Sequence, residues 1–88
     1  MKNKLYEIFI EETAEKELNK FDKSLLNRIS QKILALAENP RPLGCKKLKG
    51  SYNDYRIRIG DYRVVYEIYD DENYINIMIV RHRKEAYN

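Results

Sequence analysis

Residues 55–66 read Tyr55-Arg56-Ile57-Arg58-Ile59-Gly60-Asp61-Tyr62-Arg63-Val64-Val65-Tyr66, and this stretch decides the fold of the 88-residue chain. Apolar and basic residues alternate up to Gly60, which is the period of a strand with one buried face. An apolar run that carries Arg63 resumes directly after Gly60-Asp61, a pair that tolerates the positive φ angles of a tight turn. The stretch therefore predicts a β-hairpin with a two-residue loop.

A two-residue loop fixes which residues lie opposite one another in this hairpin. Arg58 is expected opposite Arg63, and Arg56 opposite Val65. Because side chains alternate across a strand, the three arginines share one face. Like charges placed opposite each other destabilise a sheet by roughly 0.2–1 kcal/mol, so we expect an anion to bind where Arg58 faces Arg63. The other face is predicted to be the core side and holds Tyr55, Ile57, Ile59, Tyr62, Val64 and Tyr66.

The basic residues are clustered along the chain. The total of 17 basic and 14 acidic side chains, a net charge of +3, does not by itself predict a nucleic-acid partner. Residues 46–63 are strongly basic, and such a cluster is typical of a phosphate-binding surface. The alternative is the ordinary polar face that an antiparallel sheet shows to water. The cluster consists of Lys46, Lys47, Lys49, Arg56, Arg58 and Arg63, against Asp54 and Asp61.

Composition excludes several classes of protein. Cys45 is the only cysteine, so neither a disulfide framework nor a thiolate zinc cluster is expected, and a reducing, cytoplasmic setting fits. No run approaches the roughly 20 apolar residues of a membrane span. Metal-ligand spacing and glycine-rich phosphate loops are also missing from the sequence, so no metal or cofactor is expected. With no repeat or linker, residues 1–88 are predicted to form a single domain.

Two helices are predicted before the hairpin. Thr13 is a candidate N-cap for a short helix that runs to about Lys20. Asp22 or Ser24 can cap a second, amphipathic helix, which ends before Pro40 because proline cannot continue the hydrogen-bond ladder. The apolar stripe of this second helix consists of Leu25, Ile29, Ile33 and Leu36.

A second hairpin is predicted with its loop at residues 70–73 and its last strand at Tyr74–Val80. With strands at Leu5–Ile10 and Lys46–Lys49, the sequence predicts an α+β fold. It consists of an N-terminal strand, a helical hairpin and an antiparallel three- to four-stranded meander whose helices cover one face. The expected pairs are Ile68 with Ile75, Tyr66 with Ile77, Val64 with Ile79 and Val65 with Met78, which leaves Val65, Met78 and Val80 on the arginine face.

The tail, residues 81–88, leaves the last strand beside the arginine face. His82 is the only imidazole of the chain, and histidine changes its charge near neutral pH. Tyr87 could stack on a base of single-stranded RNA, or anchor the C-terminus to the core. Unbroken alternation would turn Arg83 to the core side, so an active role for Arg83 requires a twist or bulge after Val80.

Three segments together resemble the RelE/ParE superfamily of type II toxins, and most closely its RelE-like branch. They are Lys47-Leu48-Lys49-Gly50, the stretch 55–66, and His82-Arg83-Lys84-Glu85-Ala86-Tyr87. The resemblance covers nearly the whole chain and implies a small α+β domain with a curved antiparallel sheet. It also implies a ribosome-dependent mRNA endonuclease that needs no metal and is held inactive by a cognate antitoxin.

The resemblance implies roles for named residues. In the implied reaction the ribose 2′-hydroxyl attacks the adjacent phosphate, Arg63 and Arg83 stabilise the developing charge, and Tyr87 stacks on the base. The implied catalytic set is Arg58, Arg63, His82, Arg83 and Tyr87, and the implied RNA-binding set is Lys47, Lys49, Arg56 and Arg81.

The general base is left open, because relatives carry lysines where this chain has Arg56 and Arg58, and arginine stays protonated. The proton could pass to His82, to Tyr87 or to a ribosomal group, or the reaction could rely on charge stabilisation alone. Two other functions compete with cleavage. One is a ParE-like toxin that inhibits a topoisomerase by binding, and the other is an inactive RNA-binding relative.

Overall fold

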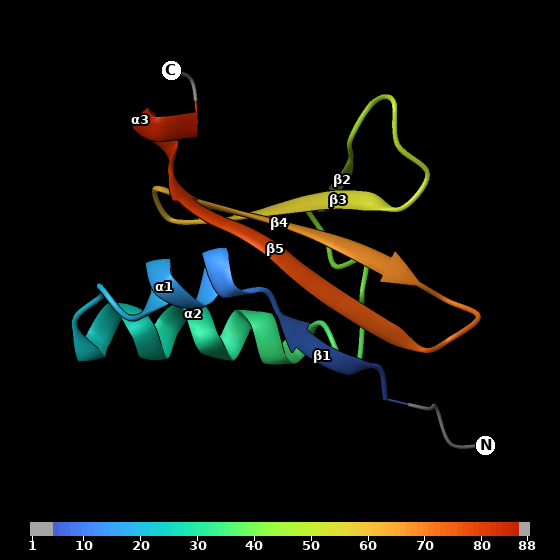
Figure 1. Ribbon diagram of the computed structural model, residues 1–88, viewed down its shortest axis with the longest axis horizontal. Coiled ribbons are helices and arrows are strands. Elements are labelled where there is room, and N and C mark those ends of the chain that lie inside the picture. Colours follow the sequence, from blue (N-terminus) through green and yellow to red (C-terminus); the bar gives the residue numbers. More distant parts are fainter. Residues whose placement is uncertain (1–4, 87–88) are drawn as a thin grey trace.

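The computed structural model describes residues 5–86, in which two helices pack on one face of a five-stranded sheet (Figure 1). The strand order is β1-β5-β4-β3-β2, with β1 parallel to β5 and every other pair antiparallel. The predicted α+β fold is confirmed, and β1 makes the sheet mixed. The elements are β1 (Glu7–Ile10), α1 (Glu12–Leu18), α2 (Lys23–Ala35), β2 (Lys46–Lys47), β3 (Asp54–Ile59), β4 (Tyr62–Tyr69), β5 (Tyr74–His82) and α3 (Arg83–Ala86).

The first hairpin has the register that the sequence predicts. Ile59 pairs with Tyr62 and Arg58 pairs with Arg63, so only Gly60 and Asp61 form the loop. Gly60 has a φ of 60°, a left-handed conformation that glycine adopts at little cost. The arginines therefore lie on one face of the sheet and the apolar side chains on the other.

The second hairpin corrects part of the prediction. Its register shifts next to Val65, so Val65 pairs with Ile79 rather than with Met78, and Val64 pairs with Val80 rather than with Ile79. Met78 is the extra residue of a β-bulge, which reverses the facing of every later residue on β5. As a consequence Val80 is buried in the core, with 2% of its surface exposed, instead of flooring the arginine face.

The helices begin and end one or more residues away from the predicted positions. Asp22 caps α2 as expected, since its carboxylate accepts a hydrogen bond of 2.9 Å from the Leu25 N–H. The predicted cap at Thr13 is wrong, because Glu11 occupies the N-cap position of α1 and Thr13 lies within the helix. Helix α2 ends at Ala35, and turns bridge it to Pro40.

The core lies between the two long helices and the sheet (Figure 1). Tyr66 is fully buried at its centre, and its hydroxyl donates a 2.7 Å hydrogen bond to the Pro40 carbonyl. Burial raises the pKa of this phenol, and the neighbouring Cys45 thiol raises it further. The other core side chains are Ala14, Leu18, Ile29, Ile33, Leu36, Ile57, Ile59, Val64, Ile68, Ile75, Ile77 and Val80.

A polar cluster fixes the loop after α2 against the far end of the sheet. The guanidinium of Arg41 donates to both carboxylate oxygens of Asp70, at 2.9 and 3.3 Å, and to the hydroxyl of Tyr55, at 3.2 and 3.3 Å. The hydroxyl of Tyr6 donates to Asp70 at 2.7 Å. Arg41 and then Tyr6 lower the pKa of the Asp70 carboxyl. Within residues 5–86, no helix combines the length and apolar character needed to traverse a bilayer.

Candidate nucleic-acid interface

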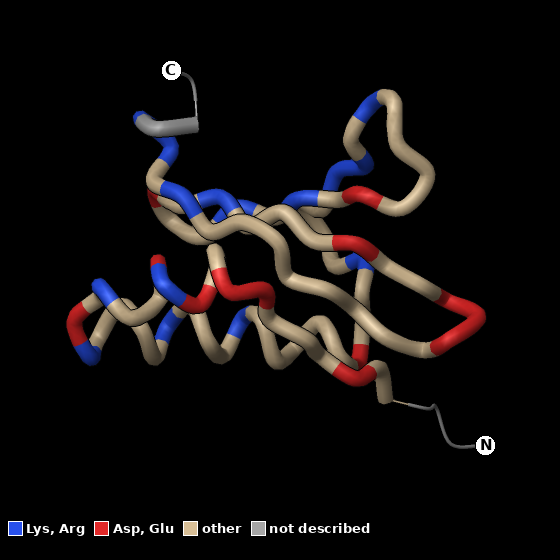
Figure 2. The backbone as a smooth tube through the Cα atoms, viewed as in Figure 1, with Lys and Arg blue, Asp and Glu red and all other residues tan. Residues whose placement is uncertain are grey.

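Three arginines lie side by side on the face of the sheet that α1 and α2 leave uncovered. Arg58 on β3 pairs with Arg63 on β4, and Arg63 pairs with Arg81 on β5. We refer to Arg58, Arg63 and Arg81 as the arginine row. Basic positions group at the end of the sheet that carries α3, and acidic positions group at the opposite end (Figure 2).

The arginine row is accessible and has an apolar floor. Arg58 and Arg81 are exposed, and Arg63 is half-buried. Beside them on the same face lie Val65, with 7% of its surface exposed, and the half-buried Ile79. A guanidinium is a planar fork that binds phosphate oxygens in pairs, so three of them over an apolar floor suit a phosphodiester chain.

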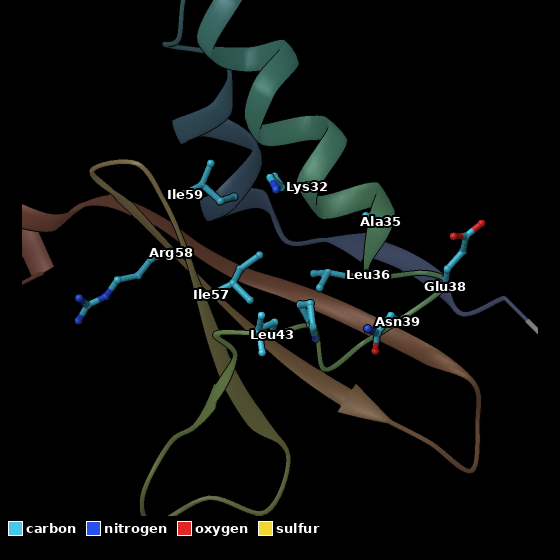
Figure 3. Close-up of a pocket in the computed structure, with 10 residues that line it drawn as sticks. Lys32, Ala35, Leu36, Glu38, Asn39, Leu43, Ile57, Arg58 and Ile59 are labelled. Atoms are coloured by element: carbon cyan, nitrogen blue, oxygen red, sulfur yellow. The ribbon is translucent and has the colours of Figure 1, made fainter.

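Neighbouring side chains of β3 point to opposite sides of the sheet. Arg58 extends away from α2, whereas Ile57 and Ile59 point toward the helix (Figure 3). On that helix side, a cavity of about 320 Å³ is lined mostly by apolar groups and opens between α2, the loop after it and β3. Arg58 also lines this cavity, so the cavity adjoins the arginine row at β3.

The lysines of the predicted RNA-binding set do not all reach the arginine face. Lys46 pairs with Arg56, which places Lys46 on the same face as the arginines. Lys47 pairs with Tyr55 and so faces the other side, and Lys49 is exposed in the turn after β2. The strand register thus places Lys46, which is not in the implied RNA-binding set, on this surface.

His82 lies away from the arginine row. It pairs with Tyr62 on the core side of the sheet, where the two rings meet edge to face with centroids 5.1 Å apart. Tyr62 packs in turn on Phe21, at 4.9 Å. The His82 Nδ1 accepts a 3.2 Å hydrogen bond from the Lys84 N–H. The ring thus stabilises the turn into α3 and lies on the side of the sheet opposite the arginine row.

Arg83 begins α3 beside the first hairpin loop. Its backbone N–H donates a 2.7 Å hydrogen bond to the carbonyl of Asp61, which ties the tail to the end of the sheet that holds the arginine row. The bulge that Arg83 needs exists, but it lies before Val80, and it brings Arg81 rather than Arg83 opposite Arg63. Tyr87 lies outside the described residues.

Of the implied catalytic set, the structure thus joins Arg58 and Arg63, places Arg83 next to them and separates His82 from them. Arg81, implied only as an RNA contact, completes the row. Arg56 lies on the same face, half-buried. Among residues 5–84, no three His, Cys, Asp or Glu side chains are positioned to hold a metal ion.

Comparisons with known proteins agree on one family. The family model for the ParE toxin of the type II toxin–antitoxin system parDE matches residues 8–87. A protein of Escherichia coli that is named as RelE-like toxin is 30% identical over 87 residues, which cover 94% of this chain and 90% of that protein.

Solved structures give the same result. The archaeal RelE–RelB complex of Pyrococcus horikoshii contains a chain that superposes with a TM-score of 0.80 at 28% identity, covering 90% of this chain and 96% of that one. The toxin–antitoxin complex RelBE2 of Mycobacterium tuberculosis gives a TM-score of 0.79 at 26% identity, over 93% and 95% of the two chains. On sequence and structure together, the chain belongs to the RelE/ParE superfamily of type II toxins, within its RelE-like branch.

Proposed function

We propose that this protein is the toxin of a type II toxin–antitoxin pair and cleaves mRNA on the ribosome. The observation that carries the proposal is the arginine row, in which Arg58, Arg63 and Arg81 occupy adjacent positions on three neighbouring strands of an uncovered face. Three guanidinium groups in adjacent positions can bind the oxygens of a phosphodiester in pairs.

The proposed reaction uses the chemistry of RNA itself. The ribose 2′-oxygen attacks the adjacent phosphorus, the bond from phosphorus to the 5′-oxygen breaks, and the products are a 2′,3′-cyclic phosphate and a 5′-hydroxyl. Negative charge accumulates on the phosphoryl oxygens during the attack. Fixed guanidinium groups stabilise that charge most strongly where the ribosome and the apolar floor exclude water. Arg63, at the centre of the row, is assigned this role, with Arg58 and Arg81 on either side.

The proton of the 2′-hydroxyl needs an acceptor that is not an arginine of the row, because guanidinium groups stay protonated in proteins. His82 faces the other side of the sheet and holds the Lys84 N–H. We therefore assign proton removal to Tyr87 or to a group of the ribosome. Arg83 starts beside the hairpin loop and is assigned to the leaving side of the phosphate, where a second positive charge favours departure of the 5′-oxygen.

The proposal includes a cognate antitoxin as the protein's partner. The structural relatives from Pyrococcus horikoshii and Mycobacterium tuberculosis are both complexes of a toxin with its antitoxin. A free nuclease of this kind would cleave the mRNA of the cell that makes it, and a bound antitoxin would prevent this cleavage. Co-expression with the product of an adjacent small open reading frame should therefore relieve growth arrest.

The experiment that tests the cleavage reaction incubates the purified protein with programmed ribosomes and maps the mRNA ends by primer extension. Cuts within translated codons are expected, and a 2′-deoxy substitution at the cut nucleotide should abolish them. Arg63→Ala should lower the cleavage rate by about 10²–10³-fold, the usual effect of removing one preorganised charge donor. Lys23→Ala, an exposed cation on α2, is the matched control and should cleave like the wild type.

A second candidate function is inhibition of a topoisomerase by binding, as in ParE-like toxins. The observation that favours it is the match of residues 8–87 to the ParE toxin family model. The two functions separate cleanly in cells that express the protein. Intact mRNA together with the loss of DNA supercoiling activity would support topoisomerase inhibition and overturn the mRNA cleavage proposal.

A further inference from the structure

The uncovered sheet face is divided into two halves of opposite charge. Four residues away from the arginine row along β3 and β4 lies a second row, in which Glu67 on β4 pairs with Asp54 on β3 and with Asn76 on β5. We refer to these three residues as the acidic row. The amide of Asn76 donates to Glu67 at 3.0 Å and to Glu11 at 2.6 Å, so it holds two carboxylates on this half.

Aromatic rings extend the acidic half toward the edge of the sheet. The ring of Tyr74 stacks on Tyr69, with centroids 4.7 Å apart, and meets Phe9 edge to face at 5.2 Å. Phe9 is 51% exposed although it is a large apolar side chain. Negative charge on this half repels a nucleic acid, so RNA bound at the arginine row would leave these rings and carboxylates uncovered.

An apolar strip separates the two rows. It consists of Val65 on β4 and its partner Ile79 on β5. Arg63 and Glu67 lie two residues to either side of Val65 on β4, a separation of about 7 Å each way at the usual rise of a strand. Arg58 and Asp54 lie two residues to either side of Arg56 on β3. A two-fold rotation about an axis along the strip therefore brings the acidic position of each strand to the place of the basic position, and the basic position to the place of the acidic one.

From this symmetry we propose that two copies of the chain associate through their uncovered sheet faces, with the two-fold axis along the apolar strip. Arg63 of each copy then lies over Glu67 of the other, Arg58 lies over Asp54, and Val65 packs on its own counterpart. Such an isologous interface is closed and self-complementary, so association stops at the dimer. Salt screens the attraction between the facing charges, so the dimer is sensitive to salt.

The dimer has a consequence for activity that rests on the proposed function. Because each copy covers the arginine row of the other, RNA and the second copy compete for the same surface. The free protein would then be held inactive at high concentration and released on dilution. Dimer formation itself involves no RNA, so sedimentation measures the inference separately from cleavage.

Charge reversal tests the interface. Sedimentation of the full chain at low salt should show a monomer–dimer equilibrium that shifts to monomer as the salt concentration rises. Arg63→Glu and Glu67→Arg should each raise the dissociation constant by about tenfold or more, and the double reversal should restore the wild-type value. Lys23→Glu and Glu15→Arg, at exposed positions of the helix side, make the same charge changes and should leave the equilibrium unchanged.

Circular dichroism should be used to check that each variant is folded. If a charge reversal on β4 unfolds the chain, Arg58→Glu and Asp54→Arg repeat the same test on β3. A protein that stays monomeric at every concentration in low salt would overturn the inference. So would a dimer that ignores the single reversals, or one in which the double reversal fails to restore binding, since the contact would then lie elsewhere.

Discussion

Arg63 on β4 lies directly opposite Arg81 on β5, and a single extra residue in β5 puts it there. Without the bulge at Met78, side-chain alternation would turn Arg81 toward the core and the row would hold only Arg58 and Arg63. The bulge thus changes a pair of opposed arginines into a row across three strands. Bulges frequently redirect a side chain next to a functional site.

Arg81→Ala should therefore impair cleavage almost as strongly as loss of Arg63. We expect the rate on programmed ribosomes to fall by about 10²-fold, because one of the charges that stabilise the phosphoryl oxygens is removed. Lys84→Ala removes an exposed cation three residues later and should change the rate less than threefold. Equal rates for wild type and Arg81→Ala would show that the row acts through Arg58 and Arg63 alone.

Deletion of Met78 tests the bulge itself. Without Met78, Ile77 and Ile79 become neighbours, so unbroken alternation keeps Val80 in the core and Arg81 opposite Arg63. We therefore expect the deletion variant to fold and to keep its cleavage activity. Met78→Ala keeps the residue count and the register and should behave in the same way. A deletion variant that loses cooperative thermal unfolding would contradict this account of β5.

The first hairpin and the covered face could be predicted from the sequence because two independent signals agree there. Gly60-Asp61 marks the turn, and the alternation on either side of it fixes the register. The bulge could not be predicted in the same way. Residues 75–80 form one nearly apolar run. A register with the bulge and a register without it therefore place equally apolar residues on both faces. The register of Arg81 follows only from the paired strands.

In the candidate site, too, some features have a local signal in the sequence and others do not. The local alternation alone predicts Arg56, Arg58 and Arg63 on one uncovered face, and the strand pairing confirms that facing. The relation of Lys46 to that face depends on a two-residue strand with no periodicity, and the parallel pairing of β1 with β5 joins segments more than sixty residues apart. Neither of these two strand pairings has a local signal in the sequence, because each depends on which edge of the sheet is open in the folded protein.

His82→Gln should leave cleavage within about twofold of the wild type, since His82 lies on the side of the sheet away from the arginine row. The variant should instead lose stability, because the edge-to-face contact with Tyr62 is lost. We expect a loss of about 1 kcal/mol, which lowers the melting temperature of a domain of this size by roughly 4–8 °C. A large fall in cleavage rate with an unchanged melting temperature would return His82 to the mechanism.

Gly60→Ala should destabilise the protein through its backbone conformation. Its φ of 60° disfavours any residue with a Cβ, at about 1 kcal/mol. A Cβ there would lie 2.7 Å from Nη2 of Arg28, which is the far end of a flexible side chain and can move aside at little cost. We expect a loss of about 1 kcal/mol in urea unfolding, both in the wild type and in an Arg28→Ala background. A clearly larger loss in the wild type would mean that Arg28 is held rigidly against the hairpin loop.

Asp70 should make the stability of the protein depend on pH in the acid range. Arg41 and Tyr6 lower the pKa of its carboxyl in the folded protein, so folding favours the ionised form. This stabilisation is fully present well above the pKa of about 3.9 that the unfolded chain has, and it is lost as the pH falls through the lower pKa of the folded state. The side chains of Arg41 and Asp70 are about half exposed, which limits the contribution at neutral pH to about 1 kcal/mol or less.

Asp70→Asn measures this contribution, because it removes the carboxylate that Arg41 contacts. Arg41→Ala removes the same contact from the other side. The free energy of unfolding of wild type minus Asp70→Asn, from urea titrations, should be positive and constant from pH 7 to about pH 5 and should shrink toward pH 2. Arg41→Ala should show the same shrinking difference, and the double variant should lose less than the sum of the two. A difference that grows as the pH falls would mean that the pKa of Asp70 is raised in the folded protein, and that the Arg41 cluster does not stabilise its charge.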